Sequence, residues 1–206
     1  MELEKRPKTN RADRKKDATR QKIVAVTLEL FQKNGIEATT MEQIAEAADV
    51  AKGTLYHYFP VKEAIISQFI QGSFQMRFAE RAAALKKLPG TRERVRLVLG
   101  ELITGIQSQP ELFEKYFVYR IRQMIAMRPE ANDTAGLNQL GLEIIQLGQE
   151  EGEIRREIPQ DMLEGFFEFI FIEVAQMYYK APAQFKAAET IDNCVDLFLH
   201  GVKPKE

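Results

Sequence analysis

The polar side chains best placed to contact another molecule lie in one short segment, Lys52 to His57. In the major groove of DNA, a lysine such as Lys52 can donate to O6 and N7 of guanine. Thr54, Tyr56 and His57 can contact phosphates, thymine methyl groups or base edges. Gly53 lies among them and adds no side chain, so the backbone can approach a ligand closely. These residue types predict nucleic-acid recognition.

The residues suited to catalysis or metal binding are not arranged in a pattern that either function requires. His57 and His200 are far apart in the sequence, and neither has the spacing of a metal ligand. The sequence has no glycine-rich phosphate loop and no nucleophile elbow. We therefore expect no enzyme activity, no metal site and no cofactor. Cys194 is the one cysteine, so an internal disulfide is impossible and a reducing, cytoplasmic location is expected.

The segment from Lys52 to His57 must be held in position by a preceding helix and a tight turn. Thr39 and Thr40 are candidate N-caps, and Glu42 and Gln43 lie three residues later to complete a capping box. Met41, Ile44, Ala45 and Ala48 then recur at helical spacing and would share one buried face. This pattern predicts a short helix that packs closely against its neighbours.

The second short helix carries the candidate contact residues. Leu55 and Phe59 are four residues apart and would point inward, which leaves the polar side chains outside. Pro60 disfavours helical geometry at Phe59, so we expect only about two turns. Together the two segments predict a helix-turn-helix with a short reading helix.

The fit extends beyond the general motif, because the segment resembles the DNA-binding domain of TetR-family transcriptional regulators. Two positions depart from the family pattern. Asp49 stands where glycine is usual, and aspartate tolerates a left-handed backbone. Ala51 stands where serine is common, which removes one possible phosphate hydrogen bond. The matching residues are Thr40, Ile44, Ala45, Ala48, Val50, Gly53, Thr54, Leu55, Tyr56, Tyr58, Phe59 and Lys62.

The resemblance implies roles for individual residues. Thr40, Tyr56 and Lys62 match phosphate-contacting positions, and Lys52 to His57 match the positions that read bases. Tyr58 has two possible roles, since it could touch DNA or pack beside Phe59. DNA-binding residues are thus expected to be Thr40, Lys52, Gly53, Thr54, Tyr56, His57 and Lys62.

Basic residues are concentrated near the N-terminus, although the 206-residue chain has a formal net charge of −1. Between Lys5 and Lys22 only Asp13 and Asp17 oppose the positive charge. Such a run is consistent with a solvated tail, but directly before a helix-turn-helix it favours a phosphate-binding arm. The basic residues are Lys5, Arg6, Lys8, Arg11, Arg14, Lys15, Lys16, Arg20 and Lys22.

Hydrophobic periodicity predicts an all-α fold. We expect a flexible basic arm over residues 1–16, a DNA-binding domain over 17–62, and an effector-binding and dimerisation domain over 63–206. A helix over about 62–87 would link them, with Ile66, Ile70, Phe74 and Phe78 as its apolar stripe. The other expected helices span 17–34, 91–107, 111–127, 134–152, 160–180 and 184–201.

The region after Pro89 resembles the effector-binding domain of the same family only in helix number and length. The family implies an effector pocket and a homodimer formed by the last two helices. Aromatic and methionine side chains could line such a pocket, although a stripe of this kind also suits a core. The candidate pocket residues are Phe113, Tyr116, Phe117, Arg120, Met124, Phe166 and Tyr178, and the candidate dimer residues are Phe167, Phe171, Val174, Val195 and Phe198.

These observations predict a ligand-responsive, sequence-specific DNA-binding regulator. The family implies a repressor that a small apolar or aromatic molecule releases from a palindromic operator. The expected partners are double-stranded DNA, the effector and a second copy of the chain, with no membrane partner because the longest apolar run is too short to span a bilayer. The alternative is an all-α effector-binding or scaffold protein whose helix-turn-helix does not bind DNA.

Overall fold

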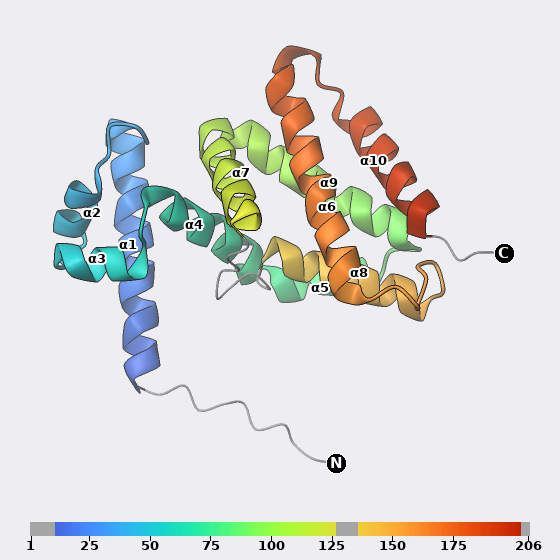
Figure 1. The fold of residues 1–206 in the computed structure, drawn as a ribbon, viewed down its shortest axis with the longest axis horizontal. Helices are drawn as coiled ribbons and strands as arrows, with labels where there is room; N and C mark the ends of the chain where they lie inside the picture. Colours follow the sequence, from blue (N-terminus) through green and yellow to red (C-terminus); the bar gives the residue numbers. More distant parts are fainter. Residues whose placement is uncertain (1–10, 127–135, 203–206) are drawn as a thin grey trace. The chain divides into compact units, whose positions relative to one another are not determined.

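A computed structural model describes residues 11–126 and 136–202, and the fold there is all helical (Figure 1). The side chains of 11–13 and 202 lie outside the described part, as do residues 1–10, 127–135 and 203–206, which include most of the predicted arm. The helices are α1 (Arg11–Asn34), α2 (Met41–Ala47), α3 (Lys52–Tyr58), α4 (Lys62–Met76), α5 (Phe78–Leu85), α6 (Thr91–Ser108), α7 (Pro110–Ile125), α8 (Leu137–Glu150), α9 (Gln160–Lys180), the short 3-10 helix η1 (Pro182–Gln184) and α10 (Ala187–Val202).

The chain divides into two compact units, Met1–Phe69 and Ile70–Glu206. The division falls within α4 and not at its start. In the first unit, α2 contacts both α1 and α3. The buried residues of α1 are Ile23, Thr27 and Phe31, whereas the apolar residues Val24 and Leu28 are only partly buried. The Thr27 hydroxyl donates to the Ile23 carbonyl at 2.7 Å, so a polar residue can occupy this face.

The first helix also begins earlier than expected. It starts at Arg11, so residues 11–16 are helical and do not belong to a flexible arm. The basic side chains Lys15 and Lys16 are exposed on this first part of α1. Both residues therefore belong to the helix that α2 contacts.

The second unit is organised around α6, which contacts α7, α8, α9 and α10. Apolar residues spaced three or four apart along α6, including Val95, Leu99, Leu102 and Ile106, are fully buried. Because the helix packs against neighbours on several sides, it forms the centre of this core. In Figure 1 the colours of these helices run from the green α6 to the red α10.

A buried arginine ties several parts of this unit together. Arg94 on α6 is 2% exposed, and its guanidinium makes two hydrogen bonds of 2.7 Å with the Glu151 carboxylate. It also donates to the backbone carbonyls of Leu85 and Leu88. The Glu151 carboxylate has its pKa lowered, first by these hydrogen bonds and then by the positive charge of Arg94. Arg94 therefore fixes the end of α8 and the segment after α5 against α6.

The expected helix over 62–87 is interrupted at Arg77, so it forms α4 and α5 instead. Arg77 has φ −108° and ψ 14°, outside helical geometry. Arg81 stabilises the break, since it donates to the Phe74 carbonyl at 3.2 Å and lies 4.9 Å from the Phe74 ring centre. Its guanidinium also contacts the Glu101 carboxylate of α6 at 2.5 Å. A side chain thus satisfies a carbonyl that the helix would otherwise leave unpaired.

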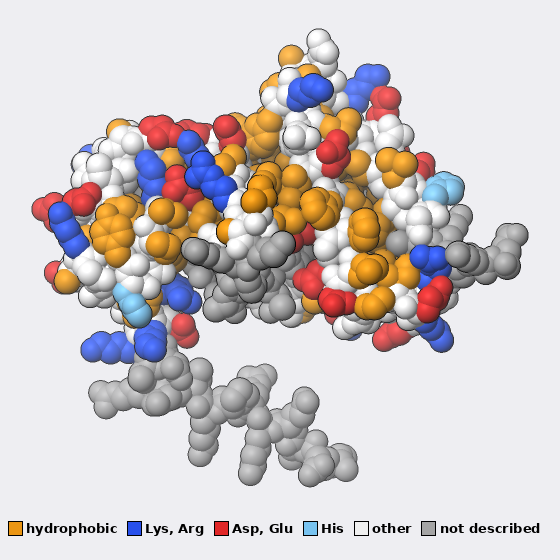
Figure 2. Space-filling view, in the orientation of Figure 1, with side chains coloured by type: hydrophobic (Ala, Val, Ile, Leu, Met, Phe, Trp, Pro, Cys, Tyr) orange, Lys and Arg blue, Asp and Glu red, His pale blue; other side chains and the backbone are white. Residues whose placement is uncertain are grey.

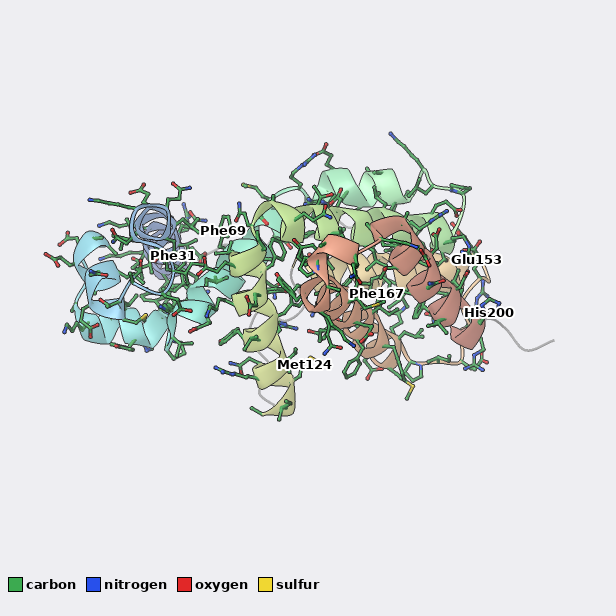
Figure 3. All side chains as sticks on the ribbon, turned by 90° about the horizontal axis from the view of Figure 1, so that it is seen from above. Phe31, Phe69, Met124, Glu153, Phe167 and His200 are labelled. Carbon is green, nitrogen blue, oxygen red and sulfur yellow. The ribbon has the colours of Figure 1, made fainter. Side chains whose placement is uncertain are left out.

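The structure places the predicted dimer residues in the core of the single chain. Phe167 is 1% exposed, and its ring contacts those of Phe171 and Phe198 at 4.8 and 5.7 Å between centres. Figure 3 shows Phe167 in the interior of the second unit. Val174 and Val195 are also buried within the single chain. All five side chains belong to the core and have almost no surface left for a second copy.

Across residues 11–126 and 136–202, no helix combines the length and apolar character that crossing a membrane requires.

Candidate functional site

Of the two capping boxes that the sequence allows before α2, the structure has the one formed by Thr40 and Gln43. The backbone N–H of Gln43 donates to the Thr40 hydroxyl at 3.2 Å, and the Thr40 N–H donates to the Gln43 side chain at 2.9 Å. The Thr40 side chain is therefore engaged at the start of α2, although the residue is exposed. In the turn between α2 and α3, Asp49 has φ 53°. The left-handed backbone expected at this position is confirmed.

Helix α3 separates an apolar inner face from a polar outer face. Leu55 is fully buried and Phe59 is 3% exposed, as the spacing predicts. Thr54, Tyr56 and His57 are exposed, and Tyr56 retains 46% of its surface. Within the part of the chain that the structure describes, Thr54 and Tyr56 make no hydrogen bond, so their polar groups are available to another molecule.

Lys52 and Gly53 begin the exposed face. The Lys52 ammonium lies 3.6 Å from the Glu42 carboxylate, and both side chains are more than half exposed. A pair of this kind contributes little stability and can separate easily when another anion approaches. A Cβ atom added at Gly53 would meet no atom within 4 Å. The fold itself therefore does not require glycine at this position.

Lys62 has a different environment from the one the resemblance implies. Its ammonium donates to the backbone carbonyls of Ile36, Glu37 and Thr39, at 2.7, 3.3 and 3.3 Å. Only 19% of the side chain is exposed. An ammonium group has three N–H donors, and all three are used within the first unit. Lys62 thus joins the start of α4 to the loop before α2, which makes a direct phosphate contact a poor description of its role.

A groove of about 500 Å³ lies beside α3 and includes residues that the motif does not contain. Lys16 and Arg20 of α1 are four residues apart and share one side of the helix. Arg20 also lies 5.9 Å from the Tyr58 ring centre and 6.0 Å from that of Phe59. Tyr58, the last residue of α3, therefore packs against Arg20 of α1. The groove is lined by Lys16, Asp17, Arg20, Gly53, Thr54, His57 and Tyr58.

The i, i+4 spacing of Lys16 and Arg20 could have identified this part of the surface, had the helix been predicted to begin before Asp17. The groove places two positive side chains next to the exposed face of α3. The positive charge of Lys16 and Arg20 beside α3 favours contact with the negatively charged backbone of DNA.

The predicted effector residues do not form one group. Phe113, Tyr116 and Phe117 of α7 are buried and contact one another, with ring centres 5.2 to 6.4 Å apart. Arg120, 3% exposed, follows on α7, and its guanidinium contacts the Glu168 carboxylate of α9 at 2.5 Å. These four side chains belong to the interior between α7 and its neighbours.

The remaining predicted pocket residues lie elsewhere. Met124 is in the last turn of α7, near the end of that helix in Figure 3, and is half-buried. Phe166 is 60% exposed, so it cannot line an enclosed pocket within the single chain. The rings that Tyr178 contacts are Tyr179 and Phe185, near the end of α9. Alternation around α9 could not be read from the sequence, because apolar residues occur on nearly all its sides.

Metal binding finds no support in the described ranges, since no group of three or more His, Cys, Asp or Glu side chains there could hold an ion.

Comparison with known proteins gives a match at the first unit. Residues 23–69 match the family model described as bacterial regulatory proteins, tetR family. The HTH-type transcriptional repressor KstR of Rhodococcus jostii (strain RHA1) is 39% identical over 97 residues, which cover 46% of this chain and 44% of that protein. The chain thus spans a little under half the length of the first curated relatives it matches.

Solved structures match over nearly the whole chain. Thermus thermophilus FadR, a TetR-family transcriptional repressor in complex with lauroyl-CoA, has a TM-score of 0.66 and 23% identity, and the match covers 91% of this chain and 96% of that one. RolR in complex with resorcinol has a TM-score of 0.58 and 16% identity, with 93% and 91% covered. At these identities the likeness shows the shared all-helical fold.

Proposed function

Because this chain belongs to the tetR family of bacterial regulatory proteins, we propose that it is a sequence-specific DNA-binding transcriptional repressor. The observation that carries the proposal is the exposed polar face of α3. Lys52, Thr54, Tyr56 and His57 project from a helix whose other side is fixed by buried Leu55. A short helix anchored on one side and polar on the other suits entry into the major groove.

In the proposed complex, Lys52 reads a base edge and Gly53 lets the α3 backbone approach the DNA. Lys16 and Arg20 contact phosphates from the neighbouring groove, and their charge supports binding to any sequence. Lys62 contributes indirectly, because its three hydrogen bonds hold the loop before α2. Base recognition and phosphate contact thus come from different helices of the first unit.

We propose that the functional form is a homodimer that reads two half-sites of a palindromic operator. Exposed apolar side chains support this proposal. Figure 2 shows hydrophobic side chains gathered over α9 in the second unit. On α9 they recur on one face, and Leu197 of α10 retains 77% of its surface. The exposed residues that replace the predicted interface are Met162, Phe166, Phe169, Met177 and Leu197.

The proposed effector is a small apolar or aromatic molecule that lowers DNA affinity. Of the two proteins of similar fold, one is in complex with lauroyl-CoA, whose acyl chain is apolar although its coenzyme A part is charged, and the other is in complex with resorcinol, which is aromatic. The effector acts by preferring one of two conformations, and it changes DNA affinity only by its difference in affinity for the two.

The test is binding of the purified protein to DNA from upstream of its own gene, titrated with salt alongside scrambled DNA. Tight binding that protects a two-fold symmetric site supports the proposal. Equal, weak and steeply salt-dependent binding to both DNAs would mean phosphate contacts alone. Absence of binding to any duplex at low salt would rule out a DNA-binding function.

A further inference from the structure

Among the described residues, one buried side chain in the second unit has no hydrogen-bond partner for either of its polar atoms. Gln71 on α4 is 5% exposed, and neither its amide nitrogen nor its amide oxygen has a hydrogen bond within residues 11–126 and 136–202. Buried polar groups in native proteins are nearly always paired, because an unpaired one loses its bonds to water without replacement. A bound molecule that pairs with the amide would replace the hydrogen bonds to water that these atoms lose on burial.

The amide lies against the start of α8. Gly136, the residue before this helix, has φ 65°, and its N–H donates to the Gln75 side chain at 3.1 Å. A Cβ atom at Gly136 would lie 2.8 Å from the Gln71 backbone oxygen and 3.0 Å from its side-chain oxygen. Glycine is thus needed at this position both for its backbone angle and for the close approach to Gln71.

The start of α8 offers a favourable environment for an oxygen atom. This helix has 14 residues and no side-chain cap at its N-terminus. Leu137 in its first turn is 2% exposed, so water has little access. The N-terminal end of a helix carries partial positive charge and favours groups with negative or partial negative charge.

We propose that Gln71 and the first turn of α8 bind a carbonyl oxygen in the head group of the effector. The Gln71 nitrogen donates to this oxygen, while the positive end of α8 stabilises its negative charge. The side-chain oxygen of Gln71 accepts a hydrogen bond from a carboxylic O–H or from a water molecule that enters with the ligand. A neutral amide suits a carbonyl or carboxyl group better than a doubly charged phosphate.

The inference rests on the proposed function and narrows its effector class to molecules with an acyl head group. A free carboxylic acid and an acyl thioester both carry this carbonyl oxygen, so the effector class includes both. Gln71 lies on α4, the helix that also carries Lys62.

The test measures the thermal midpoint of the full chain with decanoic acid, decanoyl-CoA, or coenzyme A without an acyl group. We expect one or both acyl probes to raise the Tm of the wild type and free coenzyme A to leave it unchanged. In Gln71→Leu, the ligand-induced rise should be lost. The unliganded variant should melt above the wild type, by about 2–4 °C, because an unpaired buried amide has been removed.

Gln146→Leu is the matched control, since Gln146 is an exposed glutamine on α8. It should keep the full ligand-induced rise. The proposal is overturned if neither acyl probe raises the wild-type Tm, or if the rise persists in Gln71→Leu. A lower Tm of unliganded Gln71→Leu would also overturn it, because the amide would then be a stabilising part of the core. DNA binding by the unliganded wild type is measured separately, and its absence would count against the proposed function instead.

Discussion

The two units use their charged side chains in opposite ways. In the first unit, the candidate contact residues of α3 are exposed, and the ion pair of Lys52 is long and solvated. In the second unit, Arg94 and Arg120 are almost completely buried and bind carboxylates 57 and 48 residues away. The first unit therefore keeps charge available for recognition, whereas the second uses it to join distant segments.

Lys62 is the exception that sharpens this difference. It belongs to the first unit, yet its ammonium is used for structure, as in the second. Substitutions on the exposed face of α3 should thus change DNA affinity with little effect on stability. Substitutions of Arg94 or Lys62 should act mainly through stability.

The largest expected effect is the loss of stability in Arg94→Ala. Removal of the guanidinium leaves two backbone carbonyls and the Glu151 carboxylate without their donor, at a cost of about 3 kcal/mol. Chemical denaturation should show a lower midpoint. Arg92→Ala is the control, because Arg92 forms an exposed ion pair with Asp196 and should leave the midpoint nearly unchanged.

The pH dependence of stability tests whether the ion pair between Arg94 and Glu151 stabilises the fold. Because Arg94 lowers the pKa of Glu151, the pair stabilises the fold above the ordinary carboxyl pKa of 4.5. This contribution is lost as the pH falls below 4.5 and through the lowered pKa. The stability difference between wild type and Arg94→Ala should therefore shrink in acid. A difference that stays constant down to pH 2 would contradict the role of the ion pair.

Lys62→Met should destabilise the first unit by about 1–3 kcal/mol, because three loop carbonyls lose their donor while the apolar stem is kept. Near the melting temperature DNA binding should fall with the folded fraction. At low temperature, where the chain stays folded, affinity should change little. A large loss of affinity in a variant with unchanged stability would instead indicate a direct phosphate contact.

Gly53→Ala should separate recognition from stability. The added methyl group meets no protein atom and favours the helix by up to about 1 kcal/mol, so the variant should be at least as stable as the wild type. Its affinity for the operator should fall about tenfold, or ~1.4 kcal/mol, because the methyl group keeps α3 from the DNA. Gly100→Ala in α6 also has open space around the new methyl group and should leave affinity unchanged.

The smallest expected effect is a gain of stability in Asp49→Gly. Asp49 has a left-handed backbone, and glycine adopts this conformation without the steric cost that other residues carry. We expect a gain of about 0.5–1 kcal/mol, seen as a higher Tm, with DNA affinity unchanged. Asp49→Ala should have the opposite sign, and a gain in both variants would show that backbone strain is not the cause.

Features of the first unit that depend on neighbouring residues could be predicted from the sequence, whereas features that depend on long-range contacts could not. The capping box at Thr40, the inward side of Leu55 and the turn at Asp49 depend on residues close together in the chain. Local spacing therefore identifies them. The break at Arg77 has no glycine or proline to mark it and depends on Arg81 and Glu101.

Long-range contacts account for the other errors. The hydrogen bonds of Lys62 join residues 23 to 26 positions apart, and no local pattern shows them. On α9, Phe166 and Phe167 are chemically alike, yet one is exposed and the other is in the core. Hydrophobic spacing could not separate them, because apolar residues occur around most of that helix.

The most direct test of the central claim is the ratio of affinities for upstream DNA and scrambled DNA, measured for the wild type and for Lys52→Ala. If the exposed face of α3 reads bases, the substitution should cost about 1–3 kcal/mol on the upstream DNA and much less on the scrambled DNA. The ratio should then fall by about tenfold or more, with the Tm unchanged. An unchanged affinity and an unchanged ratio would show that α3 is not the reading helix.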